Sequence, residues 1–171
     1  MLAGGVVTLA GQVDHEGVGG RQEEDMPDKA VFERLDEAEC LRLIEPGGIG
    51  RLAFAGRFDL TVLPVNYRLH KGAILFRTAQ DSSTDEDLRT GIADAEYRVA
   101  FEIDDFDMAS REGWSVLLQG PAHHLDSEAE RAEAQSAGVD PWPDGGREHF
   151  ISIIPSRITG RRIRRVPADA S

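Results

Sequence analysis

Residues 49–78 read IGRLAFAGRFDLTVLPVNYRLHKGAILFRT, and this stretch decides the fold. It holds three short runs that are apolar or alternate between apolar and polar residues: Ile49 to Ala55, Leu60 to Leu69 and Ala73 to Thr78. Such runs are typical of β-strands. The turn signals Gly56-Arg57 and His70-Lys71-Gly72 separate them. Short strands joined by tight turns predict an antiparallel meander.

The rest of the chain extends this meander. Further strand-like runs are Tyr97 to Ile103, Trp114 to Leu125, His149 to Ile154 and Arg157 to Val166. The expected helices begin at the N-caps Asp36 and Ser127, each followed by Glu three residues later, and a short helix is expected within Asp81 to Gly91. Six or seven antiparallel strands with short flanking helices predict a mainly β fold of the α+β class, a small barrel with helices outside it.

The chain divides into a tail and one domain. Residues 1–30 are Gly-rich and acidic and have no sustained apolar period, which predicts a mobile N-terminal tail. Met26 is an alternative start of the protein. Residues 31–171 have the length of one ordinary domain and show no internal repeat.

Composition argues against several classes of protein. The 171 residues include 19 Lys and Arg against 31 Asp and Glu, and the net charge of −12 argues against binding to nucleic acid or to an anionic membrane. No apolar run is long enough to span a bilayer, and Met1 to Gly11 lacks the basic flank of a secretory signal, so we expect a cytoplasmic protein. Cys40 is the only cysteine and is expected to be a buried small hydrophobe.

Several motifs that would indicate catalysis are incomplete. Gly113 to Leu117 lacks the second glycine of a nucleophile elbow, and Gly47 to Gly50 lacks the Lys-Ser/Thr pair of a P-loop. His123 and His124 point to opposite faces of a strand, so no shared metal site is predicted. Strand alternation also divides Arg161 to Arg165 between two faces, which favours a local anion site over a nucleic-acid interface.

A set of four segments occurs in a fixed order: Gly50-Arg51-Leu52-Ala53, Pro64-Val65-Asn66-Tyr67, Phe76-Arg77-Thr78-Ala79, and Gly113-Trp114-Ser115-Val116 with Gly120. In order and spacing the set resembles the pyridoxamine 5′-phosphate oxidase-like flavoproteins, in particular the branch that contains nitroimidazole-resistance reductases and many actinobacterial proteins. Pro141-Trp142 and Ile158 to Arg162 resemble the same branch. The resemblance covers about residues 31–166 and implies a split β-barrel that works as a homodimer.

The resemblance also implies a flavin mononucleotide (FMN) site at the dimer interface and a flavin-dependent oxidoreductase activity on a small molecule. The implied ring contacts are Pro64, Val65, Asn66 and Tyr67. The implied phosphate contacts are Arg77, Thr78, Ser82 and Ser83. The remaining candidates are Trp114 and Ser115, from the partner subunit, together with Trp142 and Arg161. No side chain stands out as a catalytic acid or base.

One segment departs from the family's pattern. The family commonly continues its Arg-Thr pair with Gly-Ser-Lys, whereas this chain has Gln80 to Asp87 there, with Ser83 in place of the Lys. Four carboxylates surround that position: Asp81, Asp85, Glu86 and Asp87. Loss of one charge-assisted hydrogen bond costs about 1.5–3 kcal/mol, or roughly ten- to a hundredfold in affinity, so we expect weak FMN binding.

Alternatives to a flavoenzyme stay open at this point. A split-barrel dimer that has lost FMN binding would serve as a non-catalytic binding or sensory module, and the same cleft would accept a deazaflavin or haem. Single residues have structural alternatives as well: Trp114 fills the mouth of the barrel, Asn66 caps a strand end, or Arg77 pairs with Asp104 or Glu102.

Overall fold

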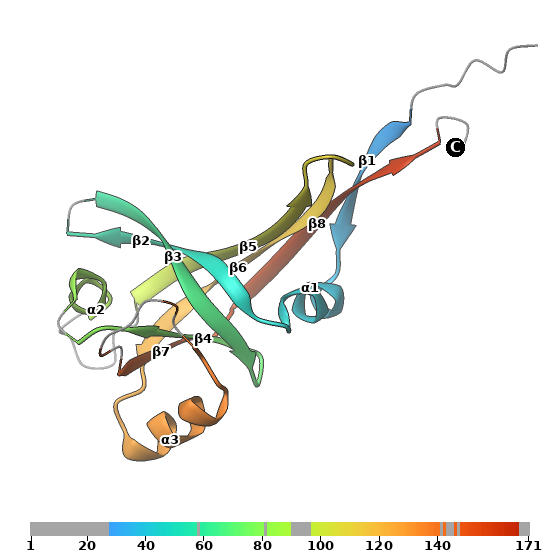
Figure 1. Ribbon diagram of the computed structural model, residues 1–171. Helices are drawn as coiled ribbons and strands as arrows, with labels where there is room; N and C mark the ends of the chain where they lie inside the picture. The colour runs from blue at the N-terminus through green and yellow to red at the C-terminus, as the bar shows by residue number, and fades with distance from the viewer. Residues whose placement is uncertain are drawn as a thin grey trace, which may run out of the picture.

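The computed structural model describes residues 28–167 apart from residues 58, 81, 90–96, 141, 143–145 and 147 (Figure 1). The elements in chain order are β1 (Lys29–Leu35), α1 (Glu37–Ile44), β2 (Gly48–Gly56), β3 (Asp59–His70), β4 (Ala73–Thr78), α2 (Ser83–Asp87), β5 (Tyr97–Asp107), β6 (Glu112–His124), α3 (Glu128–Ser136), β7 (His149–Ile153) and β8 (Arg157–Val166). Residues 1–27 of the predicted tail, which include Met26, lie outside the described residues. In the part of the chain that the structure describes, no helix has the length and apolar content needed to cross a membrane.

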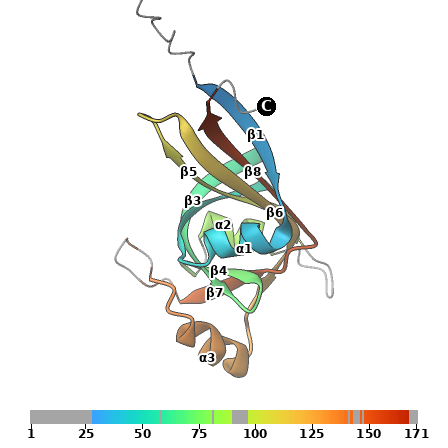
Figure 2. The same ribbon diagram turned by 90° about the vertical axis from the view of Figure 1, so that its right-hand side faces the viewer.

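The strands form one antiparallel sheet that closes on itself. Its order is β1-β8-β6-β5-β2-β3-β4-β7, and β7 pairs again with β6. Six strands from β6 to β7 therefore make a closed barrel, while β8 and β1 extend the sheet beyond it. Figures 1 and 2 show this extension at one end of the molecule and α3 beside β7 at the other. The predicted split β-barrel with short flanking helices is confirmed.

Strand β6 is the junction at which the barrel splits. Its residues Gly113 to Gln119 pair with β8, whereas Ala122 to His124 pair with β7. Gly120 lies between the two sets, where the segment after β7 crosses close to β6: a Cβ built there would overlap the carbonyl oxygen of Ile154. Only glycine allows this close approach without a backbone shift.

The barrel interior is filled by the inward-facing residues of the strands. Leu52, Phe101 and Leu118 are fully buried, and the Tyr67 ring meets the Phe101 ring edge to face at 5.5 Å between centroids. The Tyr67 hydroxyl donates to the carbonyl oxygen of Ile44 at 3.0 Å. Burial raises the pKa of Tyr67 to about 12. Tyr67 therefore fastens the end of α1 to the barrel core.

The local signals in the sequence have clear structural outcomes. Asp36 and Ser127 accept from the backbone N–H three residues on, as expected of N-caps. The turn Lys71-Gly72 has φ angles of 49° and 80°, the positive pair that a two-residue hairpin requires. Cys40 is fully buried on α1, which confirms that interpretation.

Strand β1 is the element that the sequence did not predict. Its residues alternate weakly, and Phe32, its largest apolar side chain, is 60% exposed. The strand pairs along its whole length with β8, and Arg161 lies over the Phe32 ring at 5.9 Å. Pairing with a distant strand, rather than local burial, makes this segment a strand.

Candidate functional site

A cavity of about 240 Å³ lies between β3, the end of β4 and the start of α2. We call it the Arg77 pocket, and its lining residues are Leu63, Pro64, Val65, Asn66, Phe76, Arg77, Thr78, Ala79, Ser82 and Thr84. It brings together six of the residues that the sequence predicts for a flavin site: Pro64, Val65, Asn66, Arg77, Thr78 and Ser82.

Arg77 is the cationic group of this pocket. Its guanidinium carbon lies 5.0 Å from the centre of the Phe150 ring, which orients the side chain through a cation–π contact. Its Nε is buried and has no hydrogen-bond partner within the described part of the chain. A buried polar atom without a partner costs about 1–3 kcal/mol, so such atoms are rare in folded proteins. The side chain thus presents an unused donor beside a cavity.

Hydroxyl groups line the same cavity as Arg77. The Thr78 and Ser82 hydroxyl oxygens are 2.8 Å apart, and Ser82 Oγ also accepts from the backbone N–H of Asp85 at 3.2 Å. Thr84 lines the same cavity. A guanidinium with several hydroxyls is a donor set that suits an oxyanion such as phosphate.

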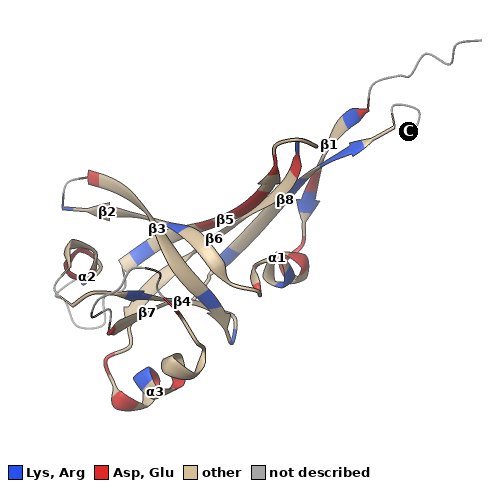
Figure 3. Cartoon of the chain, viewed as in Figure 1, with Lys and Arg blue, Asp and Glu red and all other residues tan. Residues whose placement is uncertain are grey.

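The carboxylates that follow Ser82 have partners of their own. Asp85 is buried against two histidines, while Glu86 and Asp87 both pair with Arg57. Asp81 lies outside the described residues. The expectation that these acids oppose an anion therefore does not hold for Asp85, Glu86 and Asp87, because the turn of α2 directs them to other groups. Figure 3 shows acidic residues on α2 beside basic residues on neighbouring strands.

The position at which the family carries Lys is exposed here. Ser83 is the first residue of α2 and does not line the pocket, although Ser82 and Thr84 on either side of it do. Among the described residues that line the cavity, Arg77 is the one cation. The anion-binding capacity of the pocket therefore depends on Arg77 and the hydroxyls.

Asn66 links the pocket to the segment before β7. Its Oδ1 accepts from the backbone N–H of Trp142 at 3.1 Å, and the Trp142 side chain is 74% exposed. This hydrogen bond places the exposed indole near the β3 edge of the Arg77 pocket. Asn66 therefore holds a distant segment and does not cap a strand end.

The other predicted site residues lie away from the Arg77 pocket of the same chain. Tyr67 is in the core, and Trp114 packs against the edge of that core. Ser115 and Arg161 are opposite each other in the β6–β8 pairing. The predicted residues therefore form two groups in one chain, one at the pocket and one on β6 and β8.

Members of both groups share one face of the sheet, although Trp114 packs against the core on the other face. On β3, Leu60 and Val62 are 81% and 61% exposed and alternate in phase with Pro64 and Asn66. The register carries this outward face through β2 and β5 to Ser115 on β6 and on to β8. A large exposed apolar row next to a pocket is typical of an interaction surface.

An ion-pair network lies in the middle of this face. Arg51 on β2 contacts the carboxylates of Glu102 at 2.8 Å and Asp104 at 2.7 Å on β5. The alternative in which Arg77 pairs with one of these acids is therefore wrong, because Arg51 is opposite Glu102 in the strand register and reaches both.

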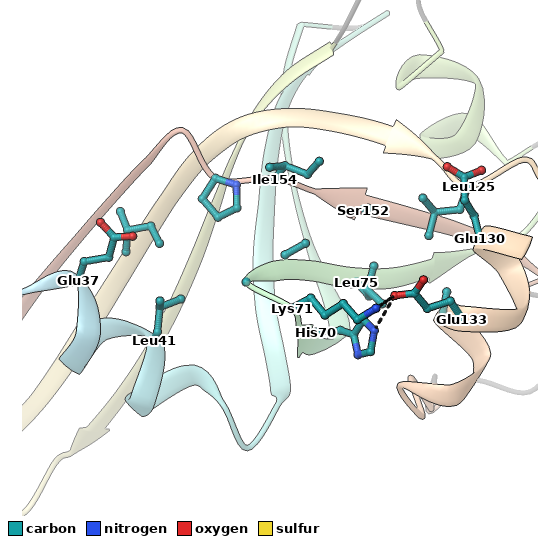
Figure 4. Close-up of a pocket in the computed structure, with 15 residues that line it drawn as sticks. Glu37, Leu41, His70, Lys71, Leu75, Leu125, Glu130, Glu133, Ser152 and Ile154 are labelled. Atoms are coloured by element: carbon teal, nitrogen blue, oxygen red, sulfur yellow. Dashed lines mark hydrogen bonds and ion pairs between the residues drawn. The ribbon is translucent and has the colours of Figure 1, made fainter.

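A second cavity, of about 370 Å³, lies between α1, the β3–β4 turn and α3 (Figure 4). Its walls are largely apolar, and three of its polar groups pair with each other: Glu133 accepts from Lys71 at 2.5 Å and lies 3.2 Å from His70. No residue of the predicted flavin site lines it. The Arg77 pocket, with its unpartnered donor, is the better candidate for a functional site.

A closed six-stranded barrel with a two-strand extension defines a split-barrel protein. The family model described as pyridoxamine 5′-phosphate oxidase matches residues 36–162, and the chain belongs to this family.

Relatives support this placement. An uncharacterized Mycobacterium tuberculosis protein, Rv0080, is 31% identical over 145 residues, which are 85% of this chain and 93% of that protein. The FAD binding protein from Mycobacterium smegmatis is 31% identical, with a TM-score of 0.62 over 78% of this chain and 98% of that one. A FAD-binding protein from Mesorhizobium loti has a TM-score of 0.64 over 77% of this chain and 98% of that one, and its 22% identity makes it a likeness of fold alone.

Proposed function

We propose that the protein is a flavin-dependent oxidoreductase that binds FMN at the interface of a homodimer, with the phosphate in the Arg77 pocket. The observation that carries this proposal is the buried, unpartnered Nε of Arg77, whose side chain lines the same cavity as Thr78 and Ser82. These residues fit a phosphate, because the guanidinium supplies a charge and the hydrogen-bonded pair of hydroxyls keeps one hydrogen to donate.

The size of the pocket agrees with a partial enclosure of the cofactor. Its volume of about 240 Å³ is below the roughly 300–1,000 Å³ of complete ligand sites. In this proposal it encloses the phosphate end of the cofactor and leaves the isoalloxazine ring outside. The ring would then lie along Pro64 to Asn66, on the exposed face of β3.

A second copy of the chain supplies the missing wall in this proposal. Leu60 and Val62 leave an apolar row exposed on the same face that carries Ser115 and Arg161. A two-fold packing of this face would bury the row and bring Ser115 and Arg161 of one copy toward the β3 edge of the other. The two separate groups of candidate residues would then form one site.

In this proposal the chain's own residues bind and orient the flavin and exclude water from it. When bound, the flavin supplies the electron-transfer chemistry. Arg77 is the one ionisable side chain among the described residues of the pocket wall, and a guanidinium serves as a fixed charge rather than as an acid or base. The pocket therefore offers no general acid or base, and we assign no catalytic side chain.

A second candidate is a split-barrel dimer that binds its ligand without turnover. The exposure of Ser83 favours it, since the lysine of the family pattern has no replacement in the wall of the pocket. FAD, which the Mycobacterium smegmatis relative binds according to its name, carries a phosphate at the same end of the ribityl chain as FMN.

Flavin titration of an Arg77 variant tests the proposal. Arg77→Gln should weaken FMN binding by about ten- to a hundredfold, and riboflavin, which lacks the phosphate, should change by less than about threefold. Arg131→Gln on the exposed surface of α3 is the matched control and should leave both affinities unchanged. Equal losses for FMN and riboflavin would place the phosphate elsewhere. Oxidoreductase turnover by the flavin-loaded protein separates the enzyme from the binding module.

A further inference from the structure

A buried polar cluster lies behind the Arg77 pocket and joins three elements. Asp85 of α2 is 2% exposed, and its Oδ1 lies 3.1 Å from Nε2 of His124 on β6 and 3.3 Å from Nδ1 of His149 on β7. Its Oδ2 accepts from Nε of Arg89 at 3.3 Å. A single carboxylate thus ties α2 to two strands of the barrel.

His149 has two competing partners on one nitrogen. Its Nδ1 lies 3.3 Å from the Asp85 carboxylate and 3.4 Å from Nη2 of Arg89. A protonated Nδ1 donates to Asp85, whereas an unprotonated Nδ1 accepts from Arg89. The hydrogen bonds of the cluster therefore depend on where its protons are.

The cluster controls residues that line the Arg77 pocket. Ser82 and Thr84 precede Asp85 on the same short segment, and both lie in the wall of the pocket. Ser82 Oγ accepts from the Asp85 backbone N–H. Moving Asp85 away from the strands therefore moves these hydroxyls.

Burial and the surrounding charges decide how Asp85 and His124 are ionised at neutral pH. Burial raises the pKa of the Asp85 carboxyl, but the hydrogen bond and charge of Arg89, with His124 and His149, outweigh it and hold that pKa below its usual value. Burial and the charge of Arg89 lower the pKa of His124, against the opposing effects of Asp85 and Asp126. Asp85 is thus ionised and His124 neutral at neutral pH.

Among the other charged groups that the structure describes near the cluster, Asp126 also acts on His124, where its charge opposes the lowering of that pKa. Asp126, after β6, lies 3.6 Å from Arg89. Glu86 and Asp87, the other acids of α2, pair with Arg57. Arg77 of β4 lies over Phe150.

We propose that Asp85 is a positioning residue for the Arg77 pocket, which fastens α2 to β6 and β7 and releases it when His124 takes up a proton. This inference rests on the proposed function, since it assigns pH regulation to the same phosphate site. A protonated His124 is a second buried cation beside Arg89, and burial and the Arg89 charge outweigh the attraction of Asp85 and Asp126 for it. Acidification therefore loosens α2 and withdraws Ser82 and Thr84 from the pocket.

Hydrogen–deuterium exchange on the ligand-free full chain tests the attachment of α2. The amides of Asp85, Glu86 and Leu88, which bond to Ser82 and Thr84, report on it. Their protection, corrected for the intrinsic pH effect, should fall about tenfold or more between about pH 7.5 and about pH 5.5. His124→Gln keeps a donor to Asp85 but does not titrate, and it should abolish this fall. An unchanged fall in that variant would overturn the inference.

A matched pair of variants tests the link to binding. Asp85→Asn and Asp87→Asn make the same substitution on the same short helix, but only Asp85 belongs to the cluster. Asp85→Asn should lower α2 protection at both pH values and weaken FMN binding by about tenfold, with less effect on riboflavin. Asp87→Asn should leave FMN binding unchanged.

The outcomes separate the two proposals. If the native protein binds FMN and the two variants bind it equally well, the role of Asp85 is refuted while the flavin site stands. If the native protein does not bind FMN, the proposed function fails and Asp85 loses its role in binding. The exchange experiment then still decides whether Asp85 fastens α2.

Discussion

Replacement of Gly120 by alanine tests the close crossing at which the barrel splits. A Cβ at this position would overlap the Ile154 carbonyl oxygen and lie 2.9 Å from its carbonyl carbon and 3.0 Å from Pro155 Cα. These are backbone atoms, so no side-chain rotation removes the clash. The crossing segment must move away from β6.

The size of the effect follows from what that movement breaks. Two backbone hydrogen bonds hold the segment to β6: Ile154 N–H to Pro121 O at 3.2 Å and Ser156 N–H to Gln119 O at 2.9 Å. Their weakening together with overpacking should cost about 2–5 kcal/mol of unfolding free energy. This corresponds to a fall in Tm of roughly 5–15 °C.

Denaturant and thermal unfolding of the variant give the answer, with Gly146→Ala as the control. A Cβ at Gly146 meets no atom within 4 Å, so its unfolding free energy should change by less than about 0.5 kcal/mol. If Gly120→Ala is as stable as Gly146→Ala, the close crossing of β6 and the segment after β7 is not a feature of the folded protein.

Three further outcomes are expected. Tyr67→Phe should lower the unfolding free energy by about 1 kcal/mol, since Ile44 O loses the Tyr67 hydroxyl but still accepts from Gly47 N–H; a neutral result in urea unfolding would show that the bond contributes nothing. The unfolding free energy should fall as pH drops below 6.5, the ordinary pKa of histidine. The pKa of His124 is lowered in the folded chain, so the unfolded chain binds a proton there at a higher pH than the folded chain does. His124→Gln should flatten this part of the stability curve, and a curve as steep as the native one would assign the effect to other groups. Ser83→Lys should tighten FMN binding by only about two- to fivefold, the worth of an exposed ion pair, because Ser83 lies outside the pocket wall; a gain of a hundredfold in the titration would show that Lys at this position reaches the phosphate.

The fold follows closely from local signals in the sequence. Alternating runs, the Lys71-Gly72 turn and the two N-caps placed all elements except β1. That strand owes its conformation to β8, which lies about 130 residues further along the chain, and its own pattern is weak. Strand order is likewise a property of pairings between distant segments, which no local pattern encodes.

The pocket was predictable only in part. Six of the candidate residues came together: five are on β3 and β4, where the family's motifs keep their places, and Ser82 follows β4 as the N-cap of α2. The cluster of Asp85, His124 and His149 left no signal, because its members come from a helix and two strands that are far apart in the chain. The pairing of His124 with Asp85 depends on α2 lying against the barrel, which is set by tertiary packing.

The ratio of the dissociation constants for riboflavin and FMN, measured on the native protein by flavin fluorescence, tests the central claim most directly. The two ligands share the isoalloxazine ring and differ in the phosphate that we assign to the Arg77 pocket. We predict that FMN binds at least about tenfold more tightly, the contribution of one charge-assisted contact. Equal affinities, or tighter binding of riboflavin, would contradict a phosphate site at Arg77.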